Sequence, residues 1–397
     1  MRSSSLLTPG PYMLRVACRI AVMILLAPGT GTAQPPAQQP DTTTLQRILA
    51  AEDARGTGPD GLTPLLDARS SPDTLLRRLA VRGLGRMQRP ELGRLLVPLL
   101  RDSIPAVRAE TATAIAQSMR RVPRTDSVKA QSAAFSTREA ARALTEALAA
   151  EAAPEVRDAL AQSLGRLALP DSASAREAEG AIRATLERQQ SAGVIHGLYT
   201  LARSRKATGN LDAGSVALLR HGALASPDTM VRRLALRTLA AAGGLDSATA
   251  VGAIHDRDDE SRRMTLRGSG DLSPTLRAAL VRTGFRDSSV IVRIEAVAAA
   301  RLGDGPPDCR PIVEGTRDPV PAIALTAVDS LGSGCADSPG AVAVLRRLAA
   351  GPVRSGPADH RWQMPAHSLL ALARLDPSAA AHLVPSAARS DRWETRV

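Results

Sequence analysis

The six histidines are the first residues that could carry out chemistry, because imidazole serves both as a metal ligand and as a general acid or base. No two of them form a HExxH pair, and none has a cysteine at the spacing of a zinc site. We therefore expect the histidines to hold no metal ion. They are His196, His221, His255, His360, His367 and His382.

The densest acidic cluster is HDRDDE at residues 255–260. A calcium-binding loop requires a central glycine and a closing acid, but Ser261 and Arg267 occupy those two positions. We interpret the acids instead as side chains that complement the positive end of a helix dipole. They are Asp256, Asp258, Asp259 and Glu260.

Motifs for a nucleophile or a bound phosphate are also missing. The chain has no GxSxG elbow, and the GSG segment at 332–334 falls where a helix should end. Gly83, Gly85 and the GSG segment at 268–270 do not follow the strand that a phosphate-binding loop needs. We predict no catalytic residue, no cofactor and no metal site in this chain.

The elements that would position these residues form a repeat. A turn residue, often a proline, is followed by an aliphatic–arginine pair and then by Ala and Leu at helical spacing, as in SPDTLLRRLAVRGLG (71–85) and SPDTMVRRLALRTLA (226–240). Many successive copies are 30 or 31 residues apart, the length of one helical hairpin. The arginines that anchor the copies are Arg77, Arg108, Arg157, Arg232, Arg262, Arg293 and Arg396, with degenerate copies at Val194, Ala324 and Pro365.

Two further positions support this alignment. Six residues before the anchors, Asp, Glu and Ser dominate, which predicts caps that accept from the exposed N–H groups of a second helix. They are Ser71, Asp102, Glu151, Arg188, Ser226, Asp256, Asp287, Asp318, Asp359 and Ser390. Seven residues after the anchors the pattern is apolar, which predicts a buried face. These positions are Leu84, Ile115, Leu164, Leu201, Leu239, Ser269, Ala300, Leu331 and Leu372.

Each hairpin should also have a more variable first helix, for example at 91–101, 137–150 and 212–224. Loop-like insertions lengthen the spacing near 121–136 and 351–357. A single hairpin cannot bury its apolar face, so neighbours must stack. We predict an all-α protein, an α-solenoid or superhelix of about nine to ten HEAT-like helical hairpins. Six aromatic residues in 397 agree with thin Ala/Leu-rich layers rather than with a compact globule.

The amino terminus resembles a secretory signal peptide. Arg15 and Arg19 precede an apolar run at 20–27, and small residues end at Ala33. We predict a signal peptide at 1–33, a Pro/Gln-rich linker at 34–42 and the solenoid at 43–397. The protein would then be exported to the periplasm or the medium, with no stable membrane insertion after cleavage. Either Met1 or Met13 could be the start.

The repeat resembles the HEAT family, in particular its short bacterial form related to phycobilisome-lyase-type repeats. The resemblance covers roughly 45–397. It implies that turn acids and anchor arginines pair along the array, here Asp102, Asp256 and Asp287 with Arg108, Arg262 and Arg293. It lapses at Val194, Ala324 and Pro365.

Two cysteines remain in the expected mature chain. Cys309 begins the first helix of one hairpin, and Cys335 follows its second helix. Because an antiparallel hairpin brings those ends together, we predict a disulfide in an oxidising compartment. Two free thiols are the alternative.

These features favour an exported scaffold that presents a concave surface to a protein or peptide. The alternative is a non-catalytic helical arm of a larger exported enzyme, because similar arms precede cyclophilin-type prolyl isomerase domains. The sequence stops at the anchor Arg396, which predicts truncation with further repeats or a catalytic domain beyond 397. A formal net charge of +12 could suit nucleic acid, as in HEAT-like DNA glycosylases. Interspersed acids, scarce aromatics and the leader argue against that partner.

Overall fold

The computed structural model describes residues 42–57, 60–121, 135–204, 210–302, 308–351 and 362–389. These residues form helices, and all of them belong to one unit of the chain. The predicted signal peptide, most of the linker and the anchor Arg396 lie outside the described residues, as do most of the two predicted insertions.

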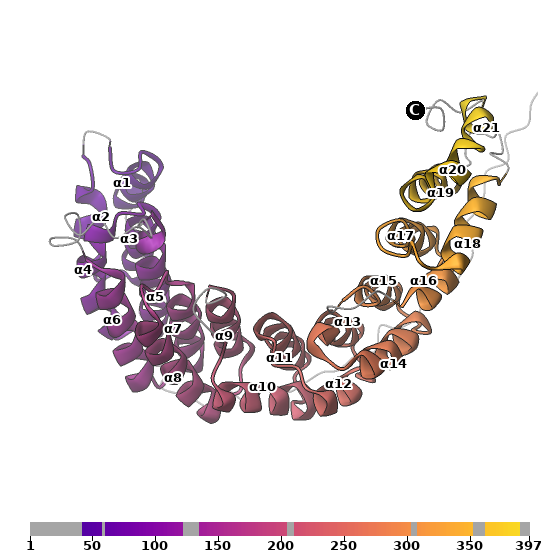
Figure 1. Ribbon diagram of the computed structural model, residues 1–397. Helices are drawn as coiled ribbons and strands as arrows, with labels where there is room; N and C mark the ends of the chain where they lie inside the picture. Colours follow the sequence, from indigo (N-terminus) through magenta and orange to yellow (C-terminus); the bar gives the residue numbers. More distant parts are fainter. Residues whose placement is uncertain are drawn as a thin grey trace, which may run out of the picture. The chain divides into compact units, whose positions relative to one another are not determined.

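The described helices form hairpins that follow one another in chain order (Figure 1). The first helices of these hairpins are α2 (Thr63–Ala68), α4 (Gly93–Leu96), α6 (Thr137–Ala150), α8 (Ser172–Arg188), α10 (Ala213–Ala225), α12 (Ser247–Ala253), α14 (Pro274–Phe285), α16 (Cys309–Gly315) and α18 (Pro339–Ala349). The second helices are α3 (Thr74–Arg86), α5 (Pro105–Ser118), α7 (Pro154–Arg166), α9 (Ala192–Ser204), α11 (Thr229–Ala242), α13 (Asp259–Arg267), α15 (Val290–Ala299), α17 (Pro321–Leu331) and α19 (Gln363–Leu375).

Three more helices lie at the ends of the described part. α1 (Thr42–Asp53) packs against α2 and α3, while α20 (Pro377–Ala381) and α21 (Val384–Ala388) follow α19. Short 3₁₀ turns complete the set: η1 (Pro90–Leu92), η2 (Val97–Arg101), η3 (Met119–Arg121) and η5 (Ser269–Asp271). The chain is therefore an α-solenoid, as the repeat predicts.

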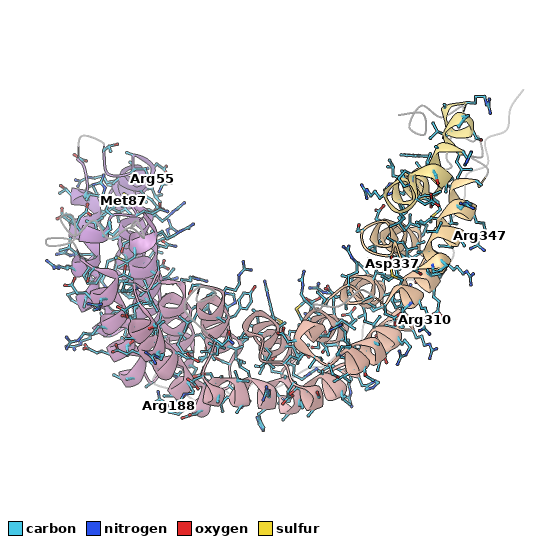
Figure 2. The ribbon with its side chains drawn as sticks, viewed as in Figure 1. Arg55, Met87, Arg188, Arg310, Asp337 and Arg347 are labelled. Atoms are coloured by element: carbon cyan, nitrogen blue, oxygen red, sulfur yellow. A yellow bond between two sulfur atoms is a disulfide. The ribbon has the colours of Figure 1, made fainter. Side chains whose placement is uncertain are left out.

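The second helices pack in an unbroken series, since each of them contacts the next from α3 to α19, and α1 packs against α3. First helices pack against their own hairpin partners and, in several places, against each other. Figure 2 shows Arg188, Arg310 and Arg347 projecting from first helices, and all three side chains are exposed. The two kinds of helix thus present separate faces.

Ala, Leu, Ile and Val side chains fill one continuous core between these two rows, from Ile48 to Ala380. All positions predicted to be apolar seven residues after an anchor are buried, including the small polar Ser269. Small side chains allow the helices to approach closely, so few aromatic rings are needed to fill the space.

The first helices differ in regularity. The predicted helices at 137–150 and 212–224 correspond to α6 and α10, with Asp212 as the N-cap of α10. The predicted helix at 91–101 is instead broken into η1, α4 and η2. Pro98 explains the break, because proline has no N–H to donate and its ring clashes with the preceding turn.

Among the described helices, none is both long enough and apolar enough to cross a membrane.

Candidate interaction surfaces

The described anchor arginines occupy equivalent places in the fold. Each is the fourth residue of a second helix, one turn from the loop that joins the two helices of its hairpin. They are Arg77 of α3, Arg108 of α5, Arg157 of α7, Arg232 of α11, Arg262 of α13 and Arg293 of α15.

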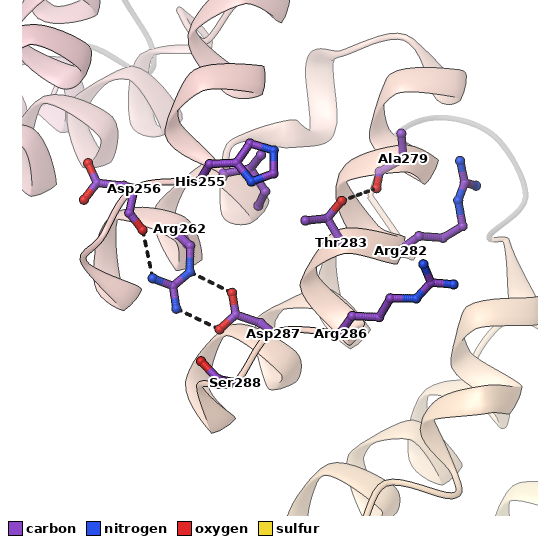
Figure 3. A pocket seen from close by; sticks show the side chains of 10 residues that line it. His255, Asp256, Arg262, Ala279, Arg282, Thr283, Arg286, Asp287 and Ser288 are labelled. Atoms are coloured by element: carbon purple, nitrogen blue, oxygen red, sulfur yellow. Dashed lines mark hydrogen bonds and ion pairs between the residues drawn. The ribbon is translucent and has the colours of Figure 1, made fainter.

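Arg262 illustrates how an anchor is held (Figure 3). Its Nη1 donates to the backbone carbonyls of Asp256 (2.9 Å) and Arg257 (3.3 Å) in its own loop. Its Nε and Nη2 donate to the two carboxylate oxygens of Asp287, both at 2.7 Å. One guanidinium thus joins its own loop to the loop of the next hairpin.

The same arrangement recurs along the chain, and we call these pairs the arginine ladder. Each rung is a guanidinium that donates from two nitrogens to a carboxylate, a geometry that favours strong, oriented hydrogen bonds. The rungs are Arg77–Asp102, Arg108–Glu151, Arg232–Asp256, Arg262–Asp287 and Arg293–Asp318.

The direction of the pairing differs from the family expectation stated for Asp102, Asp256 and Asp287. Arg108 pairs with Glu151 of the following loop, and it reaches only the backbone carbonyl of Asp102, at 2.9 Å. The stacking of the hairpins explains this pairing. Backbone carbonyls of the anchor's own loop accept from Nη1, whereas the acid of the next loop accepts from Nε and Nη2.

The acids before the anchors also act differently from the predicted caps. Asp287 accepts from the backbone N–H of Ser289 at 2.8 Å, and Ser289 itself is the N-cap residue of α15. Asp102 and Ile104 at the start of α5 are related in the same way. The carboxylates therefore orient the residue that caps the helix rather than the first helical turn.

The rungs are largely shielded from solvent. In the Arg293–Asp318 pair, 13% and 8% of the two side chains are exposed. In the Arg108–Glu151 pair, hydrogen bonds from Arg108 lower the pKa of Glu151 despite the opposing effect of burial. Loss of one partner would therefore leave the other charge poorly solvated.

The ladder is interrupted between α7 and α11. On α9 the residue equivalent to an anchor is Ile195, one position after the predicted Val194; on α19 it is Ala366 rather than Pro365. Opposite Arg157 the acid is replaced by Gln189, whose amide donates to the Pro154 carbonyl at 3.3 Å. Among the described residues, the Nε of Arg157 has no hydrogen-bond partner.

Glycines bring α7 and α9 together where the rung is lost. A Cβ on Gly197 would lie 2.5 Å from the backbone oxygen of Ala161, and a Cβ on Gly165 would collide with the backbone of Gly197. Gly193 likewise leaves room for Asp158, which accepts from Ser191 at the start of α9. Backbone contact therefore replaces ionic pairing at this interface.

Tyr199 of α9 is the centre of a cationic cluster beside this interruption. The guanidinium carbon of Arg237 lies 4.4 Å from the ring centroid, and that of Arg203 lies 5.9 Å away. Arg203 Nη1 also donates to the Tyr199 hydroxyl at 3.2 Å. The His196 ring is tilted against Tyr199 with centroids 5.8 Å apart. Sequence reasoning missed this cluster because it treated the aromatic residues only as a count.

A cleft of about 760 Å³ lies beside the Arg262–Asp287 rung, between the hairpins of α13 and α15 (Figure 3). His255, Arg282 and Arg286 line it, and all three are exposed. Arg262 and Asp287 also line it, so a change in the shape of the cleft would disturb this rung. Arg282 and Arg286 also line a smaller cleft toward α16.

The acids of HDRDDE (255–260) form hydrogen bonds and ion pairs with neighbouring hairpins. Asp256 closes a rung with Arg232, and Asp258 is the N-cap of α13 and binds Arg233. Asp259 accepts from the Ser289 hydroxyl at 2.9 Å. Asp259 and Glu260 lie in the first turn of α13, where the interpretation as helix-start acids places them, whereas Asp256 belongs to a rung. Across the described residues no group of His, Cys, Asp and Glu is arranged to hold a metal ion.

The histidines are scattered over different hairpins. His367 hydrogen-bonds Asp329 at 2.9 Å, and His221 bonds Gln190 at 3.2 Å. His382 is exposed after α20, and His360 lies outside the described residues.

In the structure a disulfide joins Cys309, the first residue of α16, to Cys335, which follows α17. Their Cα atoms are 5.9 Å apart. The bridge would tie the two open ends of one hairpin together.

One model of a known protein family matches part of this chain. Residues 62–165 match the family model that describes HEAT repeats. They include the rungs Arg77–Asp102 and Arg108–Glu151, so the first run of the ladder lies within the matched residues. The helical hairpins and the second run of rungs continue the same architecture beyond residue 165.

A solved structure shows the same fold class. The chain resembles one from the structure in which Kap95p binding induces the switch loops of RanGDP to adopt the GTP-bound conformation. The TM-score is 0.52 at 13% identity, over 87% of this chain and 49% of the other, so this protein spans about half of that chain's length. At this identity the likeness shows the α-solenoid fold alone.

A second solved structure concerns a phosphorylation switch that controls the interaction between cadherin and β-catenin. It covers 91% of this chain and 96% of its own at 14% identity, with a TM-score of 0.32. No curated protein matches the sequence significantly.

Proposed function

We propose that this protein is a scaffold that binds a protein or peptide along the exposed face of its second helices. HEAT and armadillo repeats generally bind proteins. The observation that carries the proposal here is the unbroken packing of second helices from α3 to α19. It places the side chains of successive hairpins on one continuous face, as a long polypeptide requires.

The geometry suits an extended ligand. Packed helices are about 8–10 Å apart, and an extended chain rises about 3.3 Å per residue, so roughly three ligand residues would cross each helix. Affinity would then come from many small contacts distributed over the hairpins.

We also propose that the protein is exported. The pattern of charged, apolar and small residues ending at Ala33 supports this, and so does the Cys309–Cys335 bridge, because disulfides persist in oxidising compartments. Terminal sequencing of the protein from its own cells should find Gln34 as the first residue. Cytoplasmic protein with an intact leader would contradict the proposal.

Site-specific photo-crosslinking tests the scaffold function. A photoreactive amino acid would replace exposed Arg203 on α9 or, as a matched control, exposed Arg188 on α8. Crosslinks to a second polypeptide should form from position 203 and be much weaker from position 188. Equal crosslinking from both faces, or none from either, would count against the proposal.

A further inference from the structure

Three exposed arginines on neighbouring second helices have no carboxylate partner among the described residues. Arg166 of α7 donates to the Gln162 side chain at 3.3 Å, and Arg203 of α9 donates to the Tyr199 hydroxyl. Arg237 of α11 lies over the Tyr199 ring. Their charges are therefore available to a ligand.

Equivalent arginines elsewhere are neutralised. Arg82, Arg237 and Arg267 each stand five residues after an anchor. Arg82 pairs with Glu52 at 3.1 Å, and Arg267 pairs with Glu295 at 3.6 Å. At Arg237 the neighbouring helix supplies an aromatic ring instead of an acid. Of these three equivalent arginines, Arg237 is thus the one without a carboxylate partner among the described residues.

The cluster is electropositive enough to affect its titratable members. Burial lowers the pKa of His196, and the charges of Arg166 and Arg237 lower it further. Burial opposes ionisation of Tyr199, but hydrogen bonds from Arg203 and Arg237 lower the pKa of that phenol overall. A bound anion would reduce the electrostatic repulsion between these positive groups.

We propose that Arg166, Arg203 and Arg237 bind the carboxylates of an acidic segment in a protein partner. This inference rests on the proposed scaffold function and names the chemistry of its ligand. Tyr199 acts as a positioning residue, because its ring and hydroxyl hold two of the guanidinium groups in place before the ligand arrives. Groups held in this way lose less conformational entropy when they bind.

Nucleic acid is the less suitable ligand for this cluster. A phosphate backbone needs cations at regular intervals, but on either side of the cluster Arg82 is paired with Glu52 and Arg263 with Glu295. Single-stranded bases also need open aromatic faces. Tyr199 is 7% exposed and lies beneath Arg237.

Binding of labelled poly-glutamate, poly-lysine and single-stranded oligothymidylate to the full chain tests the proposal. We expect poly-glutamate to bind with an affinity that falls as salt is added. Arg237→Gln should weaken it about tenfold, the loss of one charge-assisted hydrogen bond. Arg267→Gln, at the equivalent position of α13, should leave it unchanged. Bound poly-glutamate should also raise the pKa of His196, followed by NMR.

The outcomes separate this inference from the scaffold function. Equal weakening by Arg237→Gln and Arg267→Gln, or no change in the His196 pKa, would overturn the acidic-segment proposal. Stronger, Arg237-dependent binding of oligothymidylate would overturn it in favour of nucleic acid. Crosslinking of a partner from position 203 that Arg237→Gln leaves intact would overturn it while the scaffold function stands. Absence of any polypeptide partner would overturn both.

Discussion

The guanidinium carbon of Arg237 lies 4.4 Å from the centre of the Tyr199 ring, so a cation–π contact joins α9 to α11. Between α13 and α15 the corresponding face is joined by ion pairs of Arg263 and Arg267 with Glu295. Between α9 and α11 a tyrosine ring takes the place of the carboxylate. The two helices remain linked, but the positive charge of Arg237 has no carboxylate beside it. This exchange occurs beside α9, where Ile195 also leaves the ladder without an anchor.

The ladder should stabilise the stacking of neighbouring hairpins. Arg293→Ala removes both the link to Asp318 and the bonds to the carbonyls of its own loop. We expect a loss of about 2–3 kcal/mol, because Asp318 would be left shielded and unpaired. Hairpins in a solenoid are coupled mainly to their neighbours. Hydrogen exchange should therefore accelerate around α15 and α17 and change little in α3.

An exposed pair supplies the control for this prediction. Arg142 and Glu146 on α6 form an ion pair with 79% and 59% of their side chains exposed. Arg142→Ala should leave the free energy of unfolding almost unchanged, because solvent screens an exposed ion pair. If both variants had the same stability, the rungs would have no structural role.

The close contact of α7 and α9 should not tolerate a side chain at Gly197. In Gly197→Ala the new Cβ would lie 2.5 Å from the Ala161 carbonyl oxygen, so the helices must separate. We expect a loss of about 1–3 kcal/mol in the free energy of unfolding. Gly180 on α8 has open space around its Cβ position, and Gly180→Ala should stabilise by about 0.5–1 kcal/mol. Denaturant titrations that gave both variants the same sign would refute this account.

The Cys309–Cys335 bridge should be present in protein purified without reductant, and peptide mapping should recover the linked pair. The two residues are 26 positions apart, for which the chain-entropy description gives roughly 3 kcal/mol. The double variant Cys309→Ser, Cys335→Ser should therefore lower the temperature at which the α16–α17 hairpin unfolds. Two thiols that react with an alkylating reagent in the oxidised native protein would show the prediction to be wrong.

Acid should weaken the contact between α11 and α13. Hydrogen bonds from Arg233 and then from Ser261 hold the pKa of Asp258 at about 2, below its ordinary 3.8. Since the folded-state pKa is the lower one, the carboxylate stabilises the fold above about pH 4, and this contribution disappears as the pH falls toward 2. The stability difference between the protein and Asp258→Asn, followed by circular dichroism, should shrink over that range. A difference independent of pH would contradict the assignment.

Much of the fold follows from short-range patterns in the sequence. The apolar positions of each helix and the recurring turn residues are spaced within one hairpin, so Leu84, Leu164 and Leu239 could be assigned to the core directly. Pro98 shows the limit of that reasoning, because the general hairpin pattern hid a local break in the first helix.

The partners of the anchors depend on how hairpins stack. Arg77 meets an acid 25 residues away, whereas Arg108 meets one 43 residues away across a longer connection. Tyr199 and Arg237 come from different hairpins and share no local motif. Helix periodicity identifies which side of each helix is buried. The offset between stacked helices, set by close contacts such as Gly197 against Ala161, determines which exposed charges meet an acid and which remain free.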